Sequence, residues 1–184
     1  MRLIFCLVFL FVSFLGSLAQ TSQLGPGEIG VRMEVEGKGD IVFKLFTKEA
    51  PKTTAQIIKL VKQGFYDGIR FHRVERQPRP YLAWFGDPAA KSANLDDPKI
   101  GTGGSGTKIP FEPNGRTHIV GAVGLARPKD DKDGGDSQFY FVLGPAGFLD
   151  GNYTIFGQVV VGLDVMKKLE KGDRVSAVTI IGAP

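Results

Sequence analysis

Three residue types that carry much enzyme chemistry are scarce in this chain of 184 residues. It has one cysteine, one tryptophan and two histidines. The cysteine, Cys6, lies in an apolar N-terminal segment that has the form of a cleaved signal, so the mature chain has neither disulfides nor thiol chemistry. Leu7 follows it instead of the small residue expected after a lipoprotein acylation site. Two histidines without a mature cysteine also argue against a dedicated zinc site. We expect neither a metal nor a cofactor.

An excess of charge of one sign is missing as well. The chain has 23 Lys and Arg against 19 Asp and Glu, with a formal net charge of +4. Charges of both signs are interspersed and form no basic run, so we expect no nucleic-acid partner.

Long apolar runs are limited to residues 1–19, which have the features of a secretory signal peptide. Residues 3–15 are almost wholly apolar but too short to span a bilayer, and Ser17 and Ala19 are small residues at the positions that a signal peptidase reads. We expect an exported protein, periplasmic or secreted, with no stable membrane insertion after cleavage. A retained N-terminal anchor is the alternative. The polar, glycine-rich composition near the start of the mature chain predicts a flexible N-terminus over residues 20–29, and the length of residues 30–184 predicts one domain.

Short apolar runs predict eight β-strands. They cover residues 31–36, 41–46, 69–74, 81–85, 119–126, 138–143, 154–161 and 174–181. A helix that opens at Pro51 and ends at Gly64, and a shorter one over residues 163–169, each have one apolar face. The helices do not alternate with the strands. The pattern therefore predicts a mainly β fold, a closed eight-stranded antiparallel β-barrel capped by two α-helices.

Two partial motifs carry little chemistry. Residues 101–106 fit G-x-G-x-x-G, but no strand precedes them and prolines follow them, which argues against a dinucleotide site. Residues 131–134 resemble part of a calcium loop, but Lys129 and Tyr140 stand where the first and last ligands belong, which excludes an EF-hand. Incidental surface calcium stays an alternative. His118 is interpreted as the start of a strand.

Arg73 is the residue with the most suggestive surroundings. Alternation along strand 69–74 places it on the same face as Phe71, and alternation along strand 138–143 places Gln138 with Tyr140. Taken alone, Arg73 fits an exposed arginine above an aromatic ring, or a fixed cationic donor beside an apolar pocket. Together these residues predict a pocket with one arginine and one amide at its rim, without a nucleophile or an evident general base.

Several blocks of the sequence decide between these interpretations by their order and spacing. The blocks are Phe71-His72-Arg73-Val74, Gly86-Asp87-Pro88, Gly101-Thr102-Gly103-Gly104, Gly121-Ala122-Val123-Gly124-Leu125-Ala126-Arg127, Ser137-Gln138-Phe139, Phe148-Leu149-Asp150-Gly151 and Phe156-Gly157. Over about residues 30–182 the chain thereby resembles the cyclophilins, which are peptidyl-prolyl cis-trans isomerases. The resemblance implies an eight-stranded barrel with an outer substrate groove, proline-containing polypeptides as substrates, a monomer without cofactors, and a role in folding exported proteins.

The resemblance also implies which residues act. Arg73 and Gln138 are the implied catalytic residues, Arg73 as a donor that stabilises the twisted X–Pro bond. The implied substrate-binding residues are Phe71, Tyr81, Leu82, Trp84, Ala126, Arg127, Tyr140, Phe148, Leu149 and Tyr153.

The chain departs from the family pattern around Arg73. About three additional residues separate Arg73 from Tyr81, and Trp84 stands where the family has a glutamine that helps to hold the arginine. Tyr140 replaces a phenylalanine on the floor of the proline pocket. These departures leave the support of Arg73 open, with reduced activity as one outcome. The alternative functions are a proline-peptide-binding or chaperone-like module with weak or no isomerase activity, and a secreted barrel with an unrelated ligand.

Overall fold

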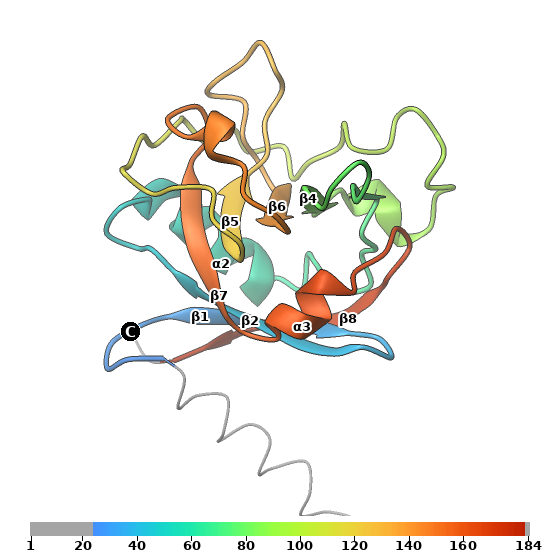
Figure 1. Cartoon of the computed structure of the whole chain (residues 1–184), viewed down its shortest axis with the longest axis horizontal. Helices are drawn as coiled ribbons and strands as arrows, with labels where there is room; N and C mark the ends of the chain where they lie inside the picture. Colours follow the sequence, from blue (N-terminus) through green and yellow to red (C-terminus); the bar gives the residue numbers. More distant parts are fainter. Residues whose placement is uncertain (1–23, 183–184) are drawn as a thin grey trace, which may run out of the picture.

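Figure 1 shows a computed structural model of the protein, which describes residues 24–182. The predicted signal peptide lies outside these residues. The strands are β1 (Gly30–Val35), β2 (Gly39–Leu45), β3 (Arg73–Val74), β4 (Leu82–Phe85), β5 (Ala122–Leu125), β6 (Phe139–Val142), β7 (Ile155–Val161) and β8 (Val175–Ile181). The helices are α2 (Pro51–Lys62) and α3 (Leu163–Lys167), with short 3-10 turns η1 (Pro88–Lys91) and η2 (Gly147–Leu149). All eight predicted strands are therefore present in part, and the strand predicted over residues 69–74 is reduced to two residues.

The strands form one antiparallel sheet in the order β3-β4-β6-β5-β7-β2-β1-β8. The sheet curls into a half-barrel and is not closed (Figure 1), so the prediction of a closed barrel is wrong. The two edge strands β3 and β8 do not pair with each other. The edges meet only where residues 68–71, before β3, bond to residues 172–175 around an isolated bridge between Arg70 and Arg174. The physical reason lies at His72, whose backbone N–H donates to Trp84 in β4. From His72 onward the chain pairs with β4 and no longer with the segment before β8.

Both helices pack on the curled sheet, α2 against β8 and α3 against β2. Ile57 and Leu60 of α2 and Met166 of α3 are buried in the same apolar core, as the amphipathic pattern predicts. Within residues 24–182, no helix has the length and the apolar character needed to cross a bilayer.

Alternation along β4, β5 and β6 sorts the apolar side chains into two groups on opposite faces of the sheet. Phe85, Phe139 and Phe141 belong to the larger group, which fills the concave side and is called the inner core below. The second group, called the outer cluster, consists of Phe46, Leu82, Ala122, Tyr140, Val142, Ala146 and Ile155, with Tyr81, Trp84, Ala126, Leu149 and Tyr153 partly buried against them. Most of the predicted substrate-binding residues thus lie in the outer cluster.

Phe71 and Arg73 do not share a face, which corrects the prediction from alternation. Phe71 is fully buried in the inner core, with its ring centroid 5.0 Å from that of Phe85. The side chain of Arg73 is 61% exposed. Phe71 pairs its backbone with Asp173. Because the chain changes pairing partner between Phe71 and Arg73, the regular twofold alternation of a strand does not carry across His72.

Carboxylates hold the long loop between β4 and β5 in place. The buried Asp87 accepts hydrogen bonds from the backbone N–H groups of Gly101 (2.6 Å) and Gly103 (3.2 Å). Glu112, further along the loop, accepts bonds of 2.8 and 2.6 Å from the backbone N–H and the hydroxyl of Thr53 in the first turn of α2. A carboxylate at this end of a helix satisfies orphan N–H groups and complements the helix dipole. The loop is therefore a fastened part of the fold.

Candidate active site

One row of residues crosses four strands on the outer face of the sheet. Arg73 in β3 lies opposite Trp84 in β4, Trp84 lies opposite Tyr140 in β6, and Tyr140 lies opposite Gly124 in β5. Gly124 makes room for the aromatic ring, because a Cβ at this position would lie only 2.3 Å from Tyr140 Cζ. The row therefore places a guanidinium beside two successive aromatic rings, although the four residues are spread over half of the domain sequence.

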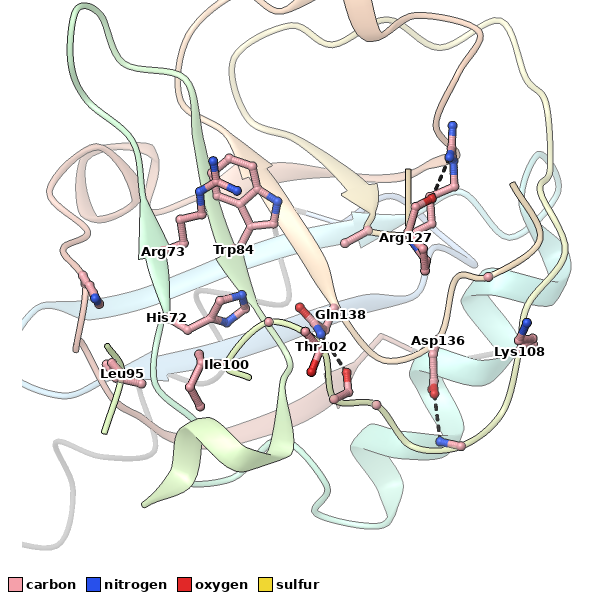
Figure 2. Close-up of a pocket in the computed structure, with 18 residues that line it drawn as sticks. His72, Arg73, Trp84, Leu95, Ile100, Thr102, Lys108, Arg127, Asp136 and Gln138 are labelled. Atoms are coloured by element: carbon pink, nitrogen blue, oxygen red, sulfur yellow. Dashed lines mark hydrogen bonds between the residues drawn. The ribbon is translucent and has the colours of Figure 1, made fainter. Parts of the chain in front are cut away.

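Arg73 is held from two sides. Its guanidinium carbon lies 4.4 Å from the ring centroid of Trp84, and the two side chains overlap in Figure 2. Its Nη2 also donates to the carboxylate of Glu75. A cation over an indole face is attracted by the ring quadrupole. Trp84 and Glu75 thus give Arg73 a support that differs from the glutamine of the family pattern.

The inserted residues after Arg73 are part of this support. The Glu75 backbone donates to the Leu82 carbonyl (2.9 Å) and accepts from the Tyr81 N–H (3.0 Å), so the insert is the tip of a hairpin that extends β3 and β4. Arg76 fastens the tip to the carbonyl of Leu169 through a bond of 2.7 Å. The insert therefore places Glu75 beside Arg73.

Gln138 is fixed by the long loop. Its Nε2 donates to the carbonyl of Gly103 over 2.7 Å (Figure 2), and Asp87 holds Gly103 from the other side. Gln138 and Arg73 border one groove of about 820 Å³. His72 also lines this groove, and burial lowers its pKa from the ordinary value of 6.5, so its ring is neutral at pH 7.

The groove runs between the long loop, the sheet and the loop after β5. The remaining residues that line it are Trp84, Leu95, Ile100, Gly101, Thr102, Gly103, Gly104, Gly106, Lys108, Ala126, Arg127, Pro128, Gly134, Asp136 and Lys171.

A chain of aromatic rings continues from the row toward the surface. Tyr81 stacks on Phe148 at a centroid distance of 5.5 Å and meets Trp84 edge-on at 6.0 Å. Tyr140 lies 6.4 Å from Trp84 and 6.0 Å from Tyr153. Phe148 is 65% exposed and forms the outer end of the chain. Such rings offer an apolar surface for a ring-shaped ligand group.

The structure brings together most of the residues that the sequence predicts for substrate binding. Seven of them belong to the outer cluster, namely Tyr81, Leu82, Trp84, Ala126, Tyr140, Leu149 and Tyr153. Phe148 joins them by stacking on Tyr81, and the guanidinium of Arg127 lies 4.5 Å from the ring centroid of Tyr153. Phe71 stands apart, because it is fully buried in the inner core and has no surface for a ligand.

His118 takes a different place from the predicted start of a strand. It lies in the irregular segment before β5, and its imidazole is fully buried. Nδ1 is 2.6 Å from Asp150 Oδ1, and Nε2 is 2.9 Å from the hydroxyl of Tyr140. No sequence signal reveals this arrangement, because the partners lie 22 and 32 residues away. Glu75 carries a weak signal, since it stands two residues after Arg73 and so on the same face of an extended chain.

The buried environment keeps the groups around Tyr140 in their ordinary charge states near pH 7. Burial lowers the pKa of His118, against the opposing effect of Asp150, and burial raises the pKa of Tyr140 well above its usual range. Hydrogen bonds from His118 lower the pKa of the Asp150 carboxyl. Asp150 is therefore ionised, and His118 and Tyr140 are neutral.

The site has the parts for conformational chemistry and lacks those for covalent chemistry. Arg73 supplies a donor, Gln138 an anchored amide, and the outer cluster an apolar surface. Around Arg73, the described residues place no serine or lysine paired with a base that would activate it as a nucleophile. Within residues 24–182, no three His, Cys, Asp or Glu side chains gather into a group that could hold a metal ion.

Comparisons with known proteins agree on one family. The family model described as cyclophilin type peptidyl-prolyl cis-trans isomerase/CLD matches residues 30–183. A probable peptidyl-prolyl cis-trans isomerase of Brucella suis is 35% identical over 167 residues, which cover 88% of this chain and 82% of the relative. The peptidyl-prolyl cis-trans isomerase B of Bacillus subtilis is 36% identical over 148 residues, which cover 80% of this chain and 95% of the relative.

A solved structure shares the fold. The crystal structure of a cyclophilin type peptidyl-prolyl cis-trans isomerase from Cryptosporidium parvum superimposes with a TM-score of 0.72 at 22% identity, and the match covers 85% of this chain and 99% of the other.

Proposed function

The chain belongs to the cyclophilin-type peptidyl-prolyl cis-trans isomerases, and we propose that it performs this reaction with Arg73 as its catalytic residue, on exported polypeptides. The observation that carries the assignment of Arg73 is the row across the sheet. It aligns Arg73, Trp84 and Tyr140 on the outer face of the sheet. A cationic donor and an apolar aromatic surface are thereby neighbours, as rotation about an X–Pro bond requires.

The reaction is slow without a catalyst because the peptide bond has partial double-bond character, with a barrier of about 18–20 kcal/mol. As the bond twists, resonance is lost and the lone pair localises on the prolyl nitrogen. A donor directed at that nitrogen, or at the adjacent carbonyl, stabilises the twisted state more than either planar state. Such preferential stabilisation accelerates rotation without a covalent step.

Arg73 fits this role because part of its guanidinium is held and part remains open. Of its five N–H donors, the hydrogen bonds found among residues 24–182 engage Nη2 alone, which contacts Glu75. The indole of Trp84 fixes the plane of the group. A donor that is already oriented needs little reorganisation as the bond twists, and one such donor is typically worth about 3–4 kcal/mol.

The neighbouring residues divide the substrate between them. In the proposal, Tyr81, Leu82, Tyr140 and Leu149 of the outer cluster receive the proline ring, and their contacts with one another support this. Gln138 contacts the peptide backbone with the amide oxygen, because its Nε2 is engaged by Gly103. Arg127 and Phe148 form the rim.

Export and a monomeric state complete the proposal. The support for export is the sequence of residues 1–19, which has an apolar stretch and small residues at the cleavage position. The folding of exported proteins supplies polypeptides with X–Pro bonds, whose isomerisation takes tens of seconds or more without catalysis. Fusion of residues 1–19 to a reporter, followed by fractionation of the cells, tests the export.

The isomerase assignment of Arg73 is tested by cis-to-trans conversion of an X–Pro tetrapeptide. We expect a rate above the uncatalysed background for the wild-type protein and a large loss for Arg73→Ala, with proline-peptide binding retained. Equal rates for the two proteins would mean that Arg73 is not the catalytic residue. Binding of proline peptides without any acceleration by the wild type would favour a binding module instead.

A further inference from the structure

A buried chain of hydrogen bonds connects the floor of the proposed proline pocket with its rim. Asp150 follows η2, the turn that carries Phe148 and Leu149. Its Oδ1 accepts bonds from the backbone N–H of His118 (2.8 Å) and from the imidazole Nδ1 (2.6 Å). The imidazole Nε2 in turn lies 2.9 Å from the hydroxyl of Tyr140, which is 2% exposed. His118 is the link between the two ends.

The carboxylate determines which imidazole nitrogen carries the proton. An ionised carboxylate only accepts hydrogen bonds, so Nδ1 of His118 must donate to Asp150. In the neutral ring Nε2 is then an acceptor, and the Tyr140 hydroxyl must donate to it. The hydroxyl hydrogen therefore points toward His118, and the ring of Tyr140 presents an apolar face to the pocket.

A second proton on His118 reverses one of these two bonds and leaves the other unchanged. Nδ1 continues to donate to Asp150, but Nε2–H now also donates, and the Tyr140 hydroxyl must direct its hydrogen elsewhere. Among residues 24–182 the Tyr140 hydroxyl has no hydrogen-bond partner besides His118, and Leu82, Val142 and Ile155 of the outer cluster offer it no acceptor because their side chains are apolar. The O–H group then points into the pocket that is to receive the proline ring.

Within residues 24–182, few titratable groups lie against His118. The titratable side chains that contact His118 come from three segments: Asp150 after η2, Tyr140 in β6 and Tyr153 before β7, whose ring centroid lies 6.4 Å away. Burial raises the pKa of Tyr140, so its hydroxyl stays protonated between pH 5 and pH 8. The charge state of the cluster between pH 5 and pH 8 therefore depends on His118 and on the ionised Asp150.

The geometry points to His118 as a positioning residue of the isomerase: in its neutral form it holds the Tyr140 hydroxyl away from the proline pocket, and gaining a proton weakens proline binding. This inference rests on the proposed function of the outer cluster. It gives the replacement of a floor phenylalanine by Tyr140 a consequence, because a phenylalanine has no hydroxyl whose direction His118 could control.

Steady-state isomerisation of an X–Pro tetrapeptide between pH 5 and pH 8 tests the inference. For the wild type we expect KM to rise about tenfold as His118 gains its proton, with kcat changing much less. The Tyr140 hydroxyl then loses His118 Nε2 as its acceptor and faces the proline ring without a hydrogen-bond partner. Tyr140→Phe should show a KM that stays constant over this range relative to its own value at pH 8. Equal pH dependence of KM in the two proteins would overturn the inference.

Two further variants separate His118 from the other histidine. His72→Asn should keep the wild-type pH dependence, because His72 lies in the groove and does not contact Tyr140. Asp150→Asn should move the midpoint of the KM change to lower pH, because the carboxylate of Asp150 raises the pKa of His118. Loss of the pH dependence in His72→Asn, or an unchanged midpoint in Asp150→Asn, would contradict the assignment.

Nuclear magnetic resonance provides a readout that does not depend on catalysis. The nitrogen-15 shifts of the His118 ring should report a proton on Nδ1 at pH 8, and chemical-shift titration with the tetrapeptide should give the same pH-dependent change in affinity. A proton on Nε2 at pH 8 would overturn the inference even if the isomerase rate is high. A wild type without isomerase activity would refute the proposed function, while the titration would still decide the role of His118.

Discussion

The same combination of three groups occurs twice on this molecule. In the first, the guanidinium of Arg73 lies over Trp84 and contacts Glu75. In the second, the guanidinium of Arg116 lies 3.9 Å from the ring centroid of Phe46 and contacts Glu49 over 2.5 Å. Both arginines are exposed in large part, with 61% and 44% of their side chains accessible. By local chemistry alone, the two combinations are nearly equivalent.

Their surroundings differ. Arg73 lies in the sheet, opposite Trp84, and borders the groove of about 820 Å³. Arg116 lies in an irregular segment and covers Phe46, which is buried. Arg116 does not line the groove. At both places, an arginine held by a carboxylate covers an aromatic ring. What makes Arg73 a candidate for catalysis is the groove on one side and the aromatic side chains of the outer cluster on the other.

The largest difference is expected from removing each arginine. Arg73→Ala should lower kcat/KM for an X–Pro tetrapeptide by about a hundred- to a thousandfold, the usual effect of losing one oriented donor. Arg116→Ala should leave kcat/KM unchanged, because it removes only an exposed ion pair. The measurement is the isomerisation rate of both variants beside the wild type. Similar losses in both would remove the distinction between the two sites.

The aromatic partners should differ next. Trp84→Leu removes the surface that orients Arg73, and a displacement of about 1 Å in a reacting group costs roughly a hundredfold in rate. Phe46→Leu should instead lower the free energy of unfolding by about 1 kcal/mol and leave the rate unchanged. Isomerase kinetics and urea denaturation of both variants measure the two effects. Full activity in Trp84→Leu would show that the indole does not orient Arg73.

The carboxylates should give a smaller contrast. Glu75→Ala should lower kcat by about fivefold, since an exposed ion pair contributes at most about 1 kcal/mol to holding its partner. Added acetate should restore part of this loss, because it can occupy the vacated position beside Arg73. Glu49→Ala should show neither effect. A higher kcat in Glu75→Ala would mean that Glu75 restrains Arg73 from its substrate.

The smallest effect is expected on stability at acidic pH. Each arginine has a buried histidine close to it in sequence, His72 or His118, and burial lowers the pKa of both from 6.5. A lowered folded-state pKa means that the unfolded chain binds the proton more readily. The stabilisation is therefore complete above about pH 6.5 and declines as the pH falls below it. Urea denaturation at pH 7.5 and at pH 5 measures the decline.

The two neighbourhoods differ here too, because the charge of Arg73 contributes to lowering the pKa of His72. Arg73→Ala should therefore reduce the decline slightly, and Arg116→Ala should not. A stability that is constant from pH 5 to pH 7.5 would show that neither histidine is kept neutral by burial.

The strand pattern predicted much of the fold, and it failed where the chain changes partner. Alternation along residues 138–143 predicted that Gln138 and Tyr140 share a face, and the structure places Phe139 and Phe141 on the opposite face, in the inner core. The run over residues 69–74 has the same composition, but only Arg73 and Val74 pair in the sheet. Its alternation therefore misplaced Phe71, because alternation holds only while one strand pairs continuously. The prediction of a closed barrel was wrong because the chain changes partner at the same place, pairing with β4 from His72 onward.

The site likewise divides into residues that the sequence predicted and contacts that only the structure shows. The resemblance to a family named Arg73, Gln138 and the residues that the structure gathers in the outer cluster. It also marked Trp84 and the insert as departures, without showing what they do. The structure shows that both departures contact Arg73, through the indole ring and through Glu75. That contact depends on the pairing of β3 with β4, which no local pattern encodes.

The sequence by itself determined which side chains share a face along β6, because the twofold repeat of a strand is a property of neighbouring residues. Only the tertiary structure decided that Arg73 stands beside Trp84, and that His118 reaches Tyr140 and Asp150. These contacts join residues from separate segments, and their geometry depends on sheet register and burial. The half-barrel itself was decided in this way, since its two edges meet over the short stretch of residues 68–71 and 172–175, after which the chain pairs with β4 instead.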